Sequence, residues 1–239
     1  SDLYVRGIAE GNGDPGDRAV WVTYSMNKED IWVSRIPVPV RDLVTAAVED
    51  SFERLADWNV YSPRWAPVAV VEEALELRDK DPYDYARAVR VFPESTRVSI
   101  RWEAMPKAVG ADGFEMEVTD RFGNRPVRVV FGSDGWVRSA SGAAPYSVNG
   151  RRRMEIDVDT AAGNYSLRMD GKTLVDREPL TETVRSVERL SFRTGPYRNE
   201  PSRQLDRYDP KLKDLDGADT PVAETVVSID NVSVLSKGR

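Results

Sequence analysis

The sequence contains neither histidine nor cysteine in its 239 residues. Without histidine, no Ser-His-Asp or Cys-His catalytic arrangement can form, and imidazole is excluded as a metal ligand. Without cysteine, the chain has no disulfide framework, no thiolate metal site and no thiolate nucleophile. Any chemistry must therefore use carboxylate, tyrosine, lysine or arginine side chains.

Long apolar runs and an excess of positive charge are missing too. No apolar stretch approaches the roughly 20 residues that a membrane-spanning helix needs, so no membrane span is expected. The chain carries 34 Lys and Arg residues against 40 Asp and Glu residues, a net charge of −6. This balance argues against nucleic acid as a partner, because phosphate binding needs a basic surface. The chain begins at Ser1 and shows no signal peptide, so we expect a processed chain or a piece of a longer one.

The clearest pattern lies in residues 153–175, where apolar and polar residues alternate in two segments. Period-two alternation places one set of side chains on each face of a β-strand. The segment 159–164 between them is small, polar and glycine-containing, which predicts a hairpin loop. Asp170-Gly171 is a dipeptide favoured where both central residues of a turn have positive φ. The apolar set predicted to face the core is Met154, Ile156, Val158, Tyr165, Leu167 and Met169.

About ten such strands, with turns every 8–12 residues, predict an all-β fold, an antiparallel β-sandwich. The last strand shows a change of phase, with Val227 and Ile229 on one parity and Val232 and Val234 on the other. A bulge near Asp230-Asn231 would keep all four residues buried.

Three regions are expected along the chain. Residues 1–41 form an N-terminal β-hairpin segment, residues 42–48 a linker, and residues 49–239 the sandwich. Within the sandwich, residues 194–220 form a long excursion without periodicity, a type of segment that is often functional or mobile.

Two resemblances to known families suggest a function. Residues 49–235 resemble the laminin-G-like, concanavalin-like jelly rolls in Asp50-Ser-Phe-Glu53, in the meander 154–175 and in Ser228-Ile-Asp-Asn-Val232. Residues 20–36 resemble the closing strands of sialidase-like BNR-repeat propellers, which often end in V-x-Y-T/S-x-N-x-x-D-I. The matching positions here are Val22, Tyr24, Ser25, Asn27, Asp30 and Ile31.

Together the resemblances imply the C-terminal part of a secreted or periplasmic, sialidase-like, glycan-active protein. The sandwich would bind carbohydrate or brace an upstream propeller domain, and these two are the expected partners. Two other hypotheses stay open. The sandwich could itself be a carboxylate-based glycoside hydrolase or polysaccharide lyase, or it could be a structural or protein-interaction domain without a small ligand.

Two pairs of residues resemble parts of catalytic sites in known enzyme families. Glu155 and Asp157 share a strand face, and laminarinase-like enzymes carry E-x-D-x-x-E on one strand. The acid/base position of that motif holds Thr160 here, whereas retaining hydrolysis needs two carboxyl groups about 5–5.5 Å apart. We therefore expect an exposed strand face. Tyr24 and Glu29 invite comparison with the tyrosine–glutamate nucleophile pair of sialidases, with structural packing as the default.

Acidic and aromatic residues are candidates for binding metal and sugar. The jelly-roll resemblance implies a structural Ca²⁺ near the paired first and last strands, with Asp50, Glu53 and Asp230 as the matching acidic positions. Glu115 and Glu117 also share a strand face, where a solvated surface is expected. Sugars stack on aromatic rings near loops, and the candidates for this role are Trp58, Tyr61, Trp65, Trp136, Tyr146 and Tyr197. Trp102, by contrast, is expected in the core.

Overall fold

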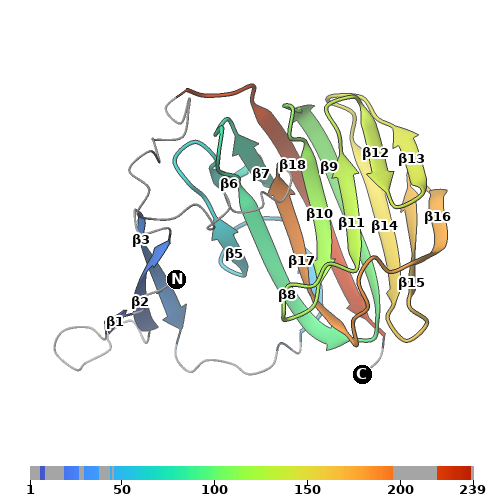
Figure 1. Ribbon diagram of the computed structural model, residues 1–239, viewed down its shortest axis with the longest axis horizontal. Helices are drawn as coiled ribbons and strands as arrows, with labels where there is room; N and C mark the ends of the chain where they lie inside the picture. Colours follow the sequence, from blue (N-terminus) through green and yellow to red (C-terminus); the bar gives the residue numbers. More distant parts are fainter. Residues whose placement is uncertain are drawn as a thin grey trace, which may run out of the picture. The chain divides into compact units, whose positions relative to one another are not determined.

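The computed structural model describes residues 6–8, 19–26, 30–37, 44, 46–195 and 220–237. The chain divides into two compact units, Ser1–Val44 and Thr45–Arg239. The first unit holds a three-stranded antiparallel sheet of β1 (Arg6–Ile8), β2 (Ala19–Met26) and β3 (Asp30–Pro37), shown in Figure 1. Strands β2 and β3 pair along their full lengths as a hairpin, with Ala19 opposite Pro37 and Met26 opposite Asp30.

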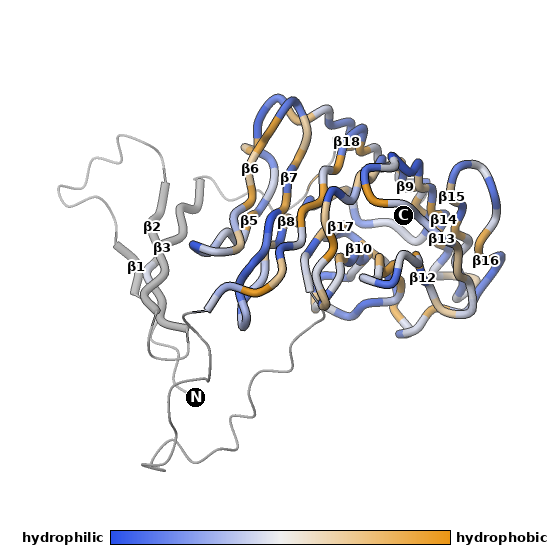
Figure 2. The backbone as a smooth tube through the Cα atoms, turned by 90° about the horizontal axis from the view of Figure 1, so that it is seen from above, coloured by the Kyte–Doolittle hydropathy of each residue, from blue (hydrophilic) through white to orange (hydrophobic). Residues whose placement is uncertain are grey.

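The second unit consists of two antiparallel sheets, which Figure 2 shows as two layers. In spatial order, the seven-stranded sheet contains β13 (Gly142–Pro145), β12 (Trp136–Ser139), β11 (Val127–Phe131), β10 (Phe114–Thr119), β17 (Val187–Thr194), β8 (Arg87–Ser95) and β5 (Trp58–Tyr61). The eight-stranded sheet contains β16 (Lys172–Pro179), β15 (Asn164–Met169), β14 (Arg152–Asp159), β9 (Arg97–Ala108), β18 (Thr225–Ser236), β7 (Ala74–Asp79) and β6 (Val68–Val71), with β4 (Val48–Asp50) paired to β18. Every regular element in the described residues is a strand, which confirms the all-β sandwich.

The meander in residues 153–175 forms as its alternation predicts. A hairpin loop joins β14 to β15 and is closed by the pair Asp159–Asn164. The six predicted core residues of the two strands are buried. Asp170 and Gly171 have φ values of 52° and 78°, so both central residues of the next turn adopt the left-handed conformation. The predicted hairpin and turn are therefore confirmed.

The predicted bulge in the last strand is also present. The pairing of β18 with β9 shifts register between Asp230 and Ser233, and Asn231 has a φ of 50°. Because of this shift, Val227 and Val232 are both buried although their parities differ. The two halves of β18 have different partners on their other side, since residues 225–229 pair with β7 and residues 232–234 pair with β4.

An aromatic cluster occupies the space between the two sheets. The ring of Phe192 on β17 lies 5.9 Å from Trp58, 6.2 Å from Phe114 and 6.1 Å from Trp102, measured between centroids. Trp102 lies on β9 of the opposite sheet and is buried, so its predicted core position is confirmed. Aromatic pairs at these separations add to the stability that burial alone provides. Phe192 thus packs against aromatic rings from both layers, which share one core.

A buried hydrogen bond joins the sheets toward the edges that β13 and β16 form. The hydroxyl groups of Tyr165 on β15 and Ser139 on β12 lie 2.8 Å apart. Ser139 Oγ donates to the carbonyl oxygen of Arg128 at 2.6 Å, so its hydroxyl accepts from Tyr165. Beside this contact, a Cβ atom on Gly142 would lie 2.5 Å from the carbonyl oxygen of Leu174, so glycine lets β13 and β16 approach.

Replacing Tyr165 with phenylalanine should lower the free energy of unfolding at pH 7 by about 1 kcal/mol, the net value of one hydrogen bond. Burial raises the pKa of Tyr165. The folded chain therefore keeps the phenolic proton at a pH where the unfolded chain, with a tyrosine pKa of about 10, loses it. Stability should consequently fall as the pH rises above about 10.

Urea unfolding between neutral and alkaline pH measures both effects. The alkaline loss of stability should be smaller in Tyr165→Phe than in the unmodified protein. Some loss should remain, because burial also raises the pKa of Tyr146. An unchanged alkaline slope in the variant would contradict the assignment.

Candidate functional site: the arginine face

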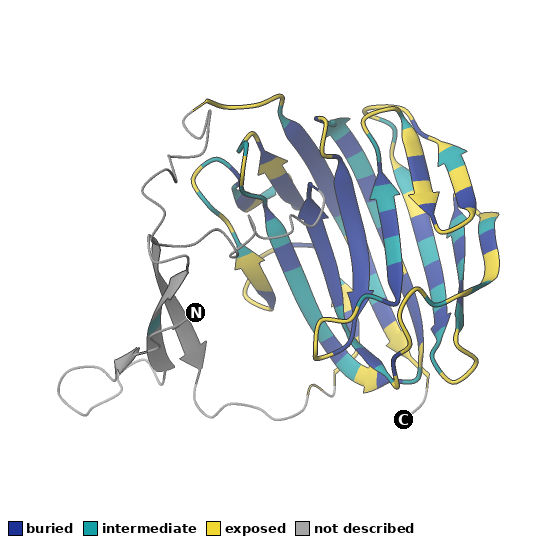
Figure 3. Ribbon diagram, viewed as in Figure 1, coloured by how far each residue is buried: buried dark blue, intermediate teal, exposed yellow. Residues whose placement is uncertain are grey.

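The outward side of the seven-stranded sheet differs from an ordinary solvated strand surface. Strand β10 is buried along its whole length and appears dark blue throughout in Figure 3. Phe114, Met116 and Val118 are buried in the core, but Glu115 and Glu117 between them are also only 1% exposed. The expectation of a solvated surface for these two glutamates is wrong. A buried carboxylate needs compensating charge and hydrogen bonds, so the surrounding residues must supply them.

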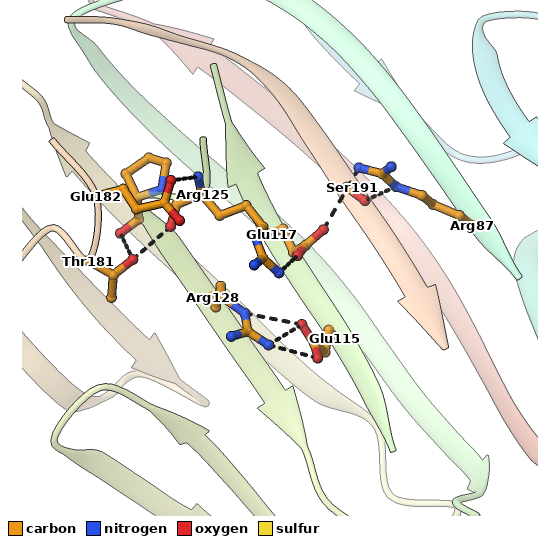
Figure 4. Close-up of polar contacts among 9 residues, drawn as sticks. Arg87, Glu115, Glu117, Arg125, Arg128, Thr181, Glu182 and Ser191 are labelled. Carbon is orange, nitrogen blue, oxygen red and sulfur yellow. Dashed lines mark hydrogen bonds and ion pairs between the residues drawn. The ribbon is translucent and has the colours of Figure 1, made fainter. Parts of the chain in front are cut away.

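Arg128 supplies this compensation for Glu115. Its Nη2 atom donates to both carboxylate oxygens at 2.9 and 2.8 Å, and its Nε atom lies 3.2 Å from Oε2 (Figure 4). Arg128 lies on β11 directly opposite Glu117, so its side chain reaches diagonally to Glu115. The fork of the guanidinium group is suited to such bidentate contact, which fixes its position as well as its charge.

Glu117 is held by two other arginines. Nη1 of Arg125 donates to Oε1 of Glu117 at 3.2 Å, and Nη2 of Arg87 lies 3.8 Å from Oε2. Nε of Arg87 also donates to Ser191 Oγ at 2.9 Å, as Figure 4 shows. The side chains of Arg87, Arg125 and Arg128 are 32%, 24% and 37% exposed, whereas the glutamates are buried. The arginines thus lie between the carboxylates and the solvent.

A fourth arginine connects this cluster to two aromatic rings. Arg193 on β17 is 1% exposed, and its guanidinium carbon lies 4.5 Å from the centroid of the Tyr85 ring. The Tyr85 ring lies 5.1 Å from that of Tyr61, whose hydroxyl donates to Asp84 at 2.8 Å. Burial lowers the pKa of Arg193, and the nearby Glu117 and Glu115 oppose this shift. Arg193 stays charged at neutral pH, because a guanidinium group is not deprotonated in proteins under these conditions.

The register places these residues side by side. Tyr61, Arg87, Arg193 and Glu115 occupy directly paired positions on β5, β8, β17 and β10. With strands about 4.8 Å apart, the four steps from β5 to β11 cover about 19 Å. We call this surface the arginine face and define it by Tyr61, Tyr85, Arg87, Glu115, Glu117, Arg125, Arg128, Ser191 and Arg193. It combines aromatic rings with ordered hydrogen-bond donors over the length of an oligosaccharide.

Two predicted sugar-binding aromatics are buried in the core, which corrects the prediction for them. Trp58 is 5% exposed, and its indole nitrogen donates to Asp50 Oδ2 at 2.7 Å. Tyr146 is buried with its ring edge against Phe131, and its hydroxyl donates to the carbonyl oxygen of Gly132 at 2.7 Å. Both polar atoms have partners within the protein, and neither ring offers a face to a ligand.

The other predicted aromatics lie nearer the surface. Tyr61 and Trp65 are half-buried, and Trp136 at the start of β12 is 41% exposed. Among these, Tyr61 contributes to the arginine face. Tyr197 lies outside the described residues, as does Glu29, and Tyr24 lies on β2 opposite Trp32. The Tyr24–Glu29 pair therefore stays a prediction.

Glu155 and Asp157 lie on the outward face of the eight-stranded sheet, as their alternation predicts. Arg101 and Arg168 pair with Glu155 at 3.3 and 3.1 Å, and Ser99 donates to Asp157 at 2.6 Å. Beside them is an open groove of about 600 Å³ whose outward side chains are Glu49, Ser51, Arg101, Glu103, Arg153, Glu155, Asn231 and Ser233. The small side chain of Ser233 lies between Glu49 and Arg101 in the register, which leaves the floor of the groove low.

The predicted calcium ligands are engaged elsewhere. Asp50 accepts hydrogen bonds from the backbone N–H of Phe52 and from Trp58, and Asp230 pairs with Arg151 at 3.1 Å. Glu53 is exposed. In the part of the chain that the structure describes, no three acidic side chains are grouped to hold a metal. A Ca²⁺ site at these residues stays a prediction.

The sequence model of a family described as "Sialidase-like, CBM domain" matches residues 58–207, more than half of the chain. The chain belongs to the sialidase-like CBM domain family. A solved structure named "Sialidase" is similar over 98% of this chain, with 34% sequence identity and a TM-score of 0.86. The chain spans 22% of that sialidase's length. No curated protein shows significant similarity.

More distant structures share the fold alone. They include the alginate lyase Aly36B, with 9% identity, a TM-score of 0.51 and coverage of 82% of this chain and 98% of that one. The Crh5 transglycosylase in complex with NAG has 13% identity, a TM-score of 0.55 and coverage of 82% of this chain and 86% of that one.

The complete arginine face of this sialidase-like CBM domain lies within the matched residues 58–207. The described residues contain no helix long and apolar enough to cross a membrane.

Proposed function

We propose that this domain is a non-catalytic module that binds carbohydrate through its arginine face. The observation that carries the proposal is the paired row of Tyr61, Arg87, Arg193 and Glu115 across four strands. Aromatic rings provide an apolar surface for the C–H face of a sugar ring, and guanidinium groups donate hydrogen bonds to its oxygen atoms. Because buried glutamates hold the arginines in place, little conformational entropy is lost when a ligand binds.

The groove on the opposite sheet is the less suitable binding surface. Its outward side chains include no aromatic ring, since Trp102 beneath it is buried in the core. Its arginines are paired with carboxylates, Arg101 with Glu155 and Arg153 with Glu103. A sugar hydroxyl would have to compete with these ion pairs without gaining a stacking contact.

The environment of the carboxylates supports a non-catalytic role. Retaining or inverting hydrolysis uses two carboxyl groups that flank the bond to be broken. Glu115 and Glu117 are covered by arginines, and Glu155 is paired with two more. Thr160, at the place of a third motif carboxylate, donates to the carbonyl oxygen of Arg185 at 2.8 Å. These contacts favour binding over bond cleavage.

The whole protein would be a secreted or periplasmic, sialidase-like enzyme that acts on glycans. Strands β2 and β3 of the N-terminal unit would be the last strands of its BNR-repeat propeller, in line with the resemblance of residues 20–36. The sandwich would then hold the enzyme close to its polymeric substrate.

Replacing Tyr61 with alanine should weaken binding to a recognised polysaccharide about tenfold, because a stacking contact of about 1.4 kcal/mol is lost. Affinity electrophoresis against a panel of neutral and acidic polysaccharides measures the change. Phe122→Ala is the matched control, since Phe122 is 84% exposed at the turn between β10 and β11 and lies outside the arginine face.

Two results would contradict the proposal. Full retention of affinity by Tyr61→Ala, with a loss in Phe122→Ala, would place the ligand elsewhere. Release of new reducing or unsaturated ends from any polysaccharide of the panel would show that the domain is itself a hydrolase or a lyase.

A further inference from the structure

The arginine face has a charge pattern that differs from that of the chain as a whole. The chain carries a net charge of −6, whereas four arginines surround two glutamates at the centre of this face, a local balance of 4 − 2 = +2. Two more carboxylates lie at its margins. Asp84 accepts a hydrogen bond from Tyr61, and Glu182 accepts one from the backbone N–H of Arg125. The positive charge is therefore concentrated between β8 and β11.

Two guanidinium groups at this centre retain donors that point to no acceptor within the described part of the chain. Arg87 uses Nε for Ser191 and turns Nη2 toward Glu117, while Arg128 uses Nε and Nη2 for Glu115. Among the described residues, Nη1 of each arginine donates to no acceptor. Both side chains are about one third exposed, so these N–H groups are within reach of a bound ligand.

Fixed guanidinium groups bind oxyanions more strongly than they bind neutral hydroxyl groups. Charge-assisted hydrogen bonds are roughly twice as strong as neutral ones, and the planar fork of arginine fits carboxylate and sulfate groups. On the opposite sheet, by contrast, the outward side chains of the groove include two arginines, Arg101 and Arg153, against three glutamates, Glu49, Glu103 and Glu155, a local balance of 2 − 3 = −1. The two outward surfaces of the sandwich thus differ in their capacity for an anion.

We propose that the arginine face selects saccharides whose sugar units carry an oxyanion, either a carboxylate or a sulfate group. The anionic group is placed over Arg87 and Arg128, and a neighbouring sugar ring lies toward Tyr61 and Tyr85. This inference rests on the proposed carbohydrate-binding function and adds the class of ligand to it.

The test compares the full chain with polymers that differ only in their charge. Affinity electrophoresis and titration calorimetry use polygalacturonate, its carboxyl-reduced derivative and a sulfated galactan with its desulfated form. Binding to at least one acidic polymer should be about tenfold or more stronger than binding to its neutral counterpart. It should also weaken as the salt concentration rises from about 0.02 to 0.5 M, because salt screens exposed charges. Binding to polygalacturonate would indicate recognition of a carboxylate group, and binding to the sulfated galactan would indicate recognition of a sulfate group.

Variants locate the site. Arg87→Gln should reduce affinity for the acidic polymer about tenfold, since it removes one charged donor pair. Arg87→Lys keeps the positive charge and serves as the test if Arg87→Gln does not fold. It should recover only part of the affinity, because lysine lacks the planar fork of arginine. Arg101→Gln is the matched control on the opposite sheet, where Arg101 is 55% exposed.

The possible outcomes separate this inference from the function on which it rests. Equal, salt-insensitive binding of charged and neutral polymers that Tyr61→Ala abolishes would keep the carbohydrate-binding proposal and overturn the anionic selectivity. A loss in Arg101→Gln with none in Arg87→Gln would move the anion site to the groove and overturn the inference. Binding to no saccharide would overturn both proposals.

Discussion

Replacing Phe192 with alanine should lower the free energy of unfolding by about 4 kcal/mol and the melting temperature by about 10 °C. Phe192 is fully buried and its ring packs against Trp58, Phe114 and Trp102. Truncation would leave a cavity whose walls belong to both sheets. Neither layer can fill that cavity without moving against the other, so the cost should lie toward the upper end for a large-to-small replacement.

Urea unfolding of the full chain, followed by tryptophan fluorescence, measures this loss directly, because two of the three neighbouring rings are tryptophans. Phe122→Ala makes the same chemical change at a residue that is 84% exposed, and it should alter the free energy of unfolding by less than about 0.5 kcal/mol. A loss of under about 1 kcal/mol in Phe192→Ala would contradict a core shared by both sheets.

The inward face of the sandwich could be predicted from the sequence because it obeys a local rule. In each strand of the meander the apolar residues occupy alternate positions, and their burial then fixes which face of the strand points inward. The same rule predicted the bulge in β18, since Val227 and Val232 cannot both be buried without an extra residue between them. Both inferences need only neighbouring residues in the sequence.

The arginine face could not be predicted in this way because its contacts cross strands. Alternation places Glu115 and Glu117 on the outward side, where a solvated position is the default. Their burial depends on Arg128 from the next strand and on Arg87, which lies two strands away in the sheet. The one local sign is the pair of glutamates on β10 followed, after a turn, by Arg125 and Arg128, which suggests cross-strand ion pairs.

The sugar-binding aromatics show the same limit. Trp58 and Tyr146 both stand near loops in the sequence, yet each is held in the core by a hydrogen bond to a distant acceptor, Asp50 and Gly132 respectively. Loop proximity says nothing about whether a ring turns inward. Tyr61, only three residues after Trp58, has the opposite parity on the same strand and therefore joins the outward face.

Replacing Arg128 with methionine should lower the free energy of unfolding by about 3 kcal/mol, because it leaves the buried carboxylate of Glu115 without its partner. Glu115→Met should cost less, about 1 kcal/mol, since Arg128 is 37% exposed and water can solvate the guanidinium group. The double variant should recover most of the loss in Arg128→Met, because two apolar side chains leave no uncompensated charge.

Urea unfolding of the three variants gives the coupling free energy of the pair as a double-mutant cycle. Arg101→Met is the matched control, since its ion pair with Glu155 is exposed and should contribute at most about 1 kcal/mol. Equal losses in Arg128→Met and Arg101→Met would show that Glu115 gains water as soon as Arg128 is removed. A larger loss in Arg128→Met than in Arg101→Met would instead mean that the folded sheet keeps water from Glu115. The buried carboxylate then holds the Arg128 guanidinium in place. A ligand that reaches the arginine face then meets a donor whose position is already fixed.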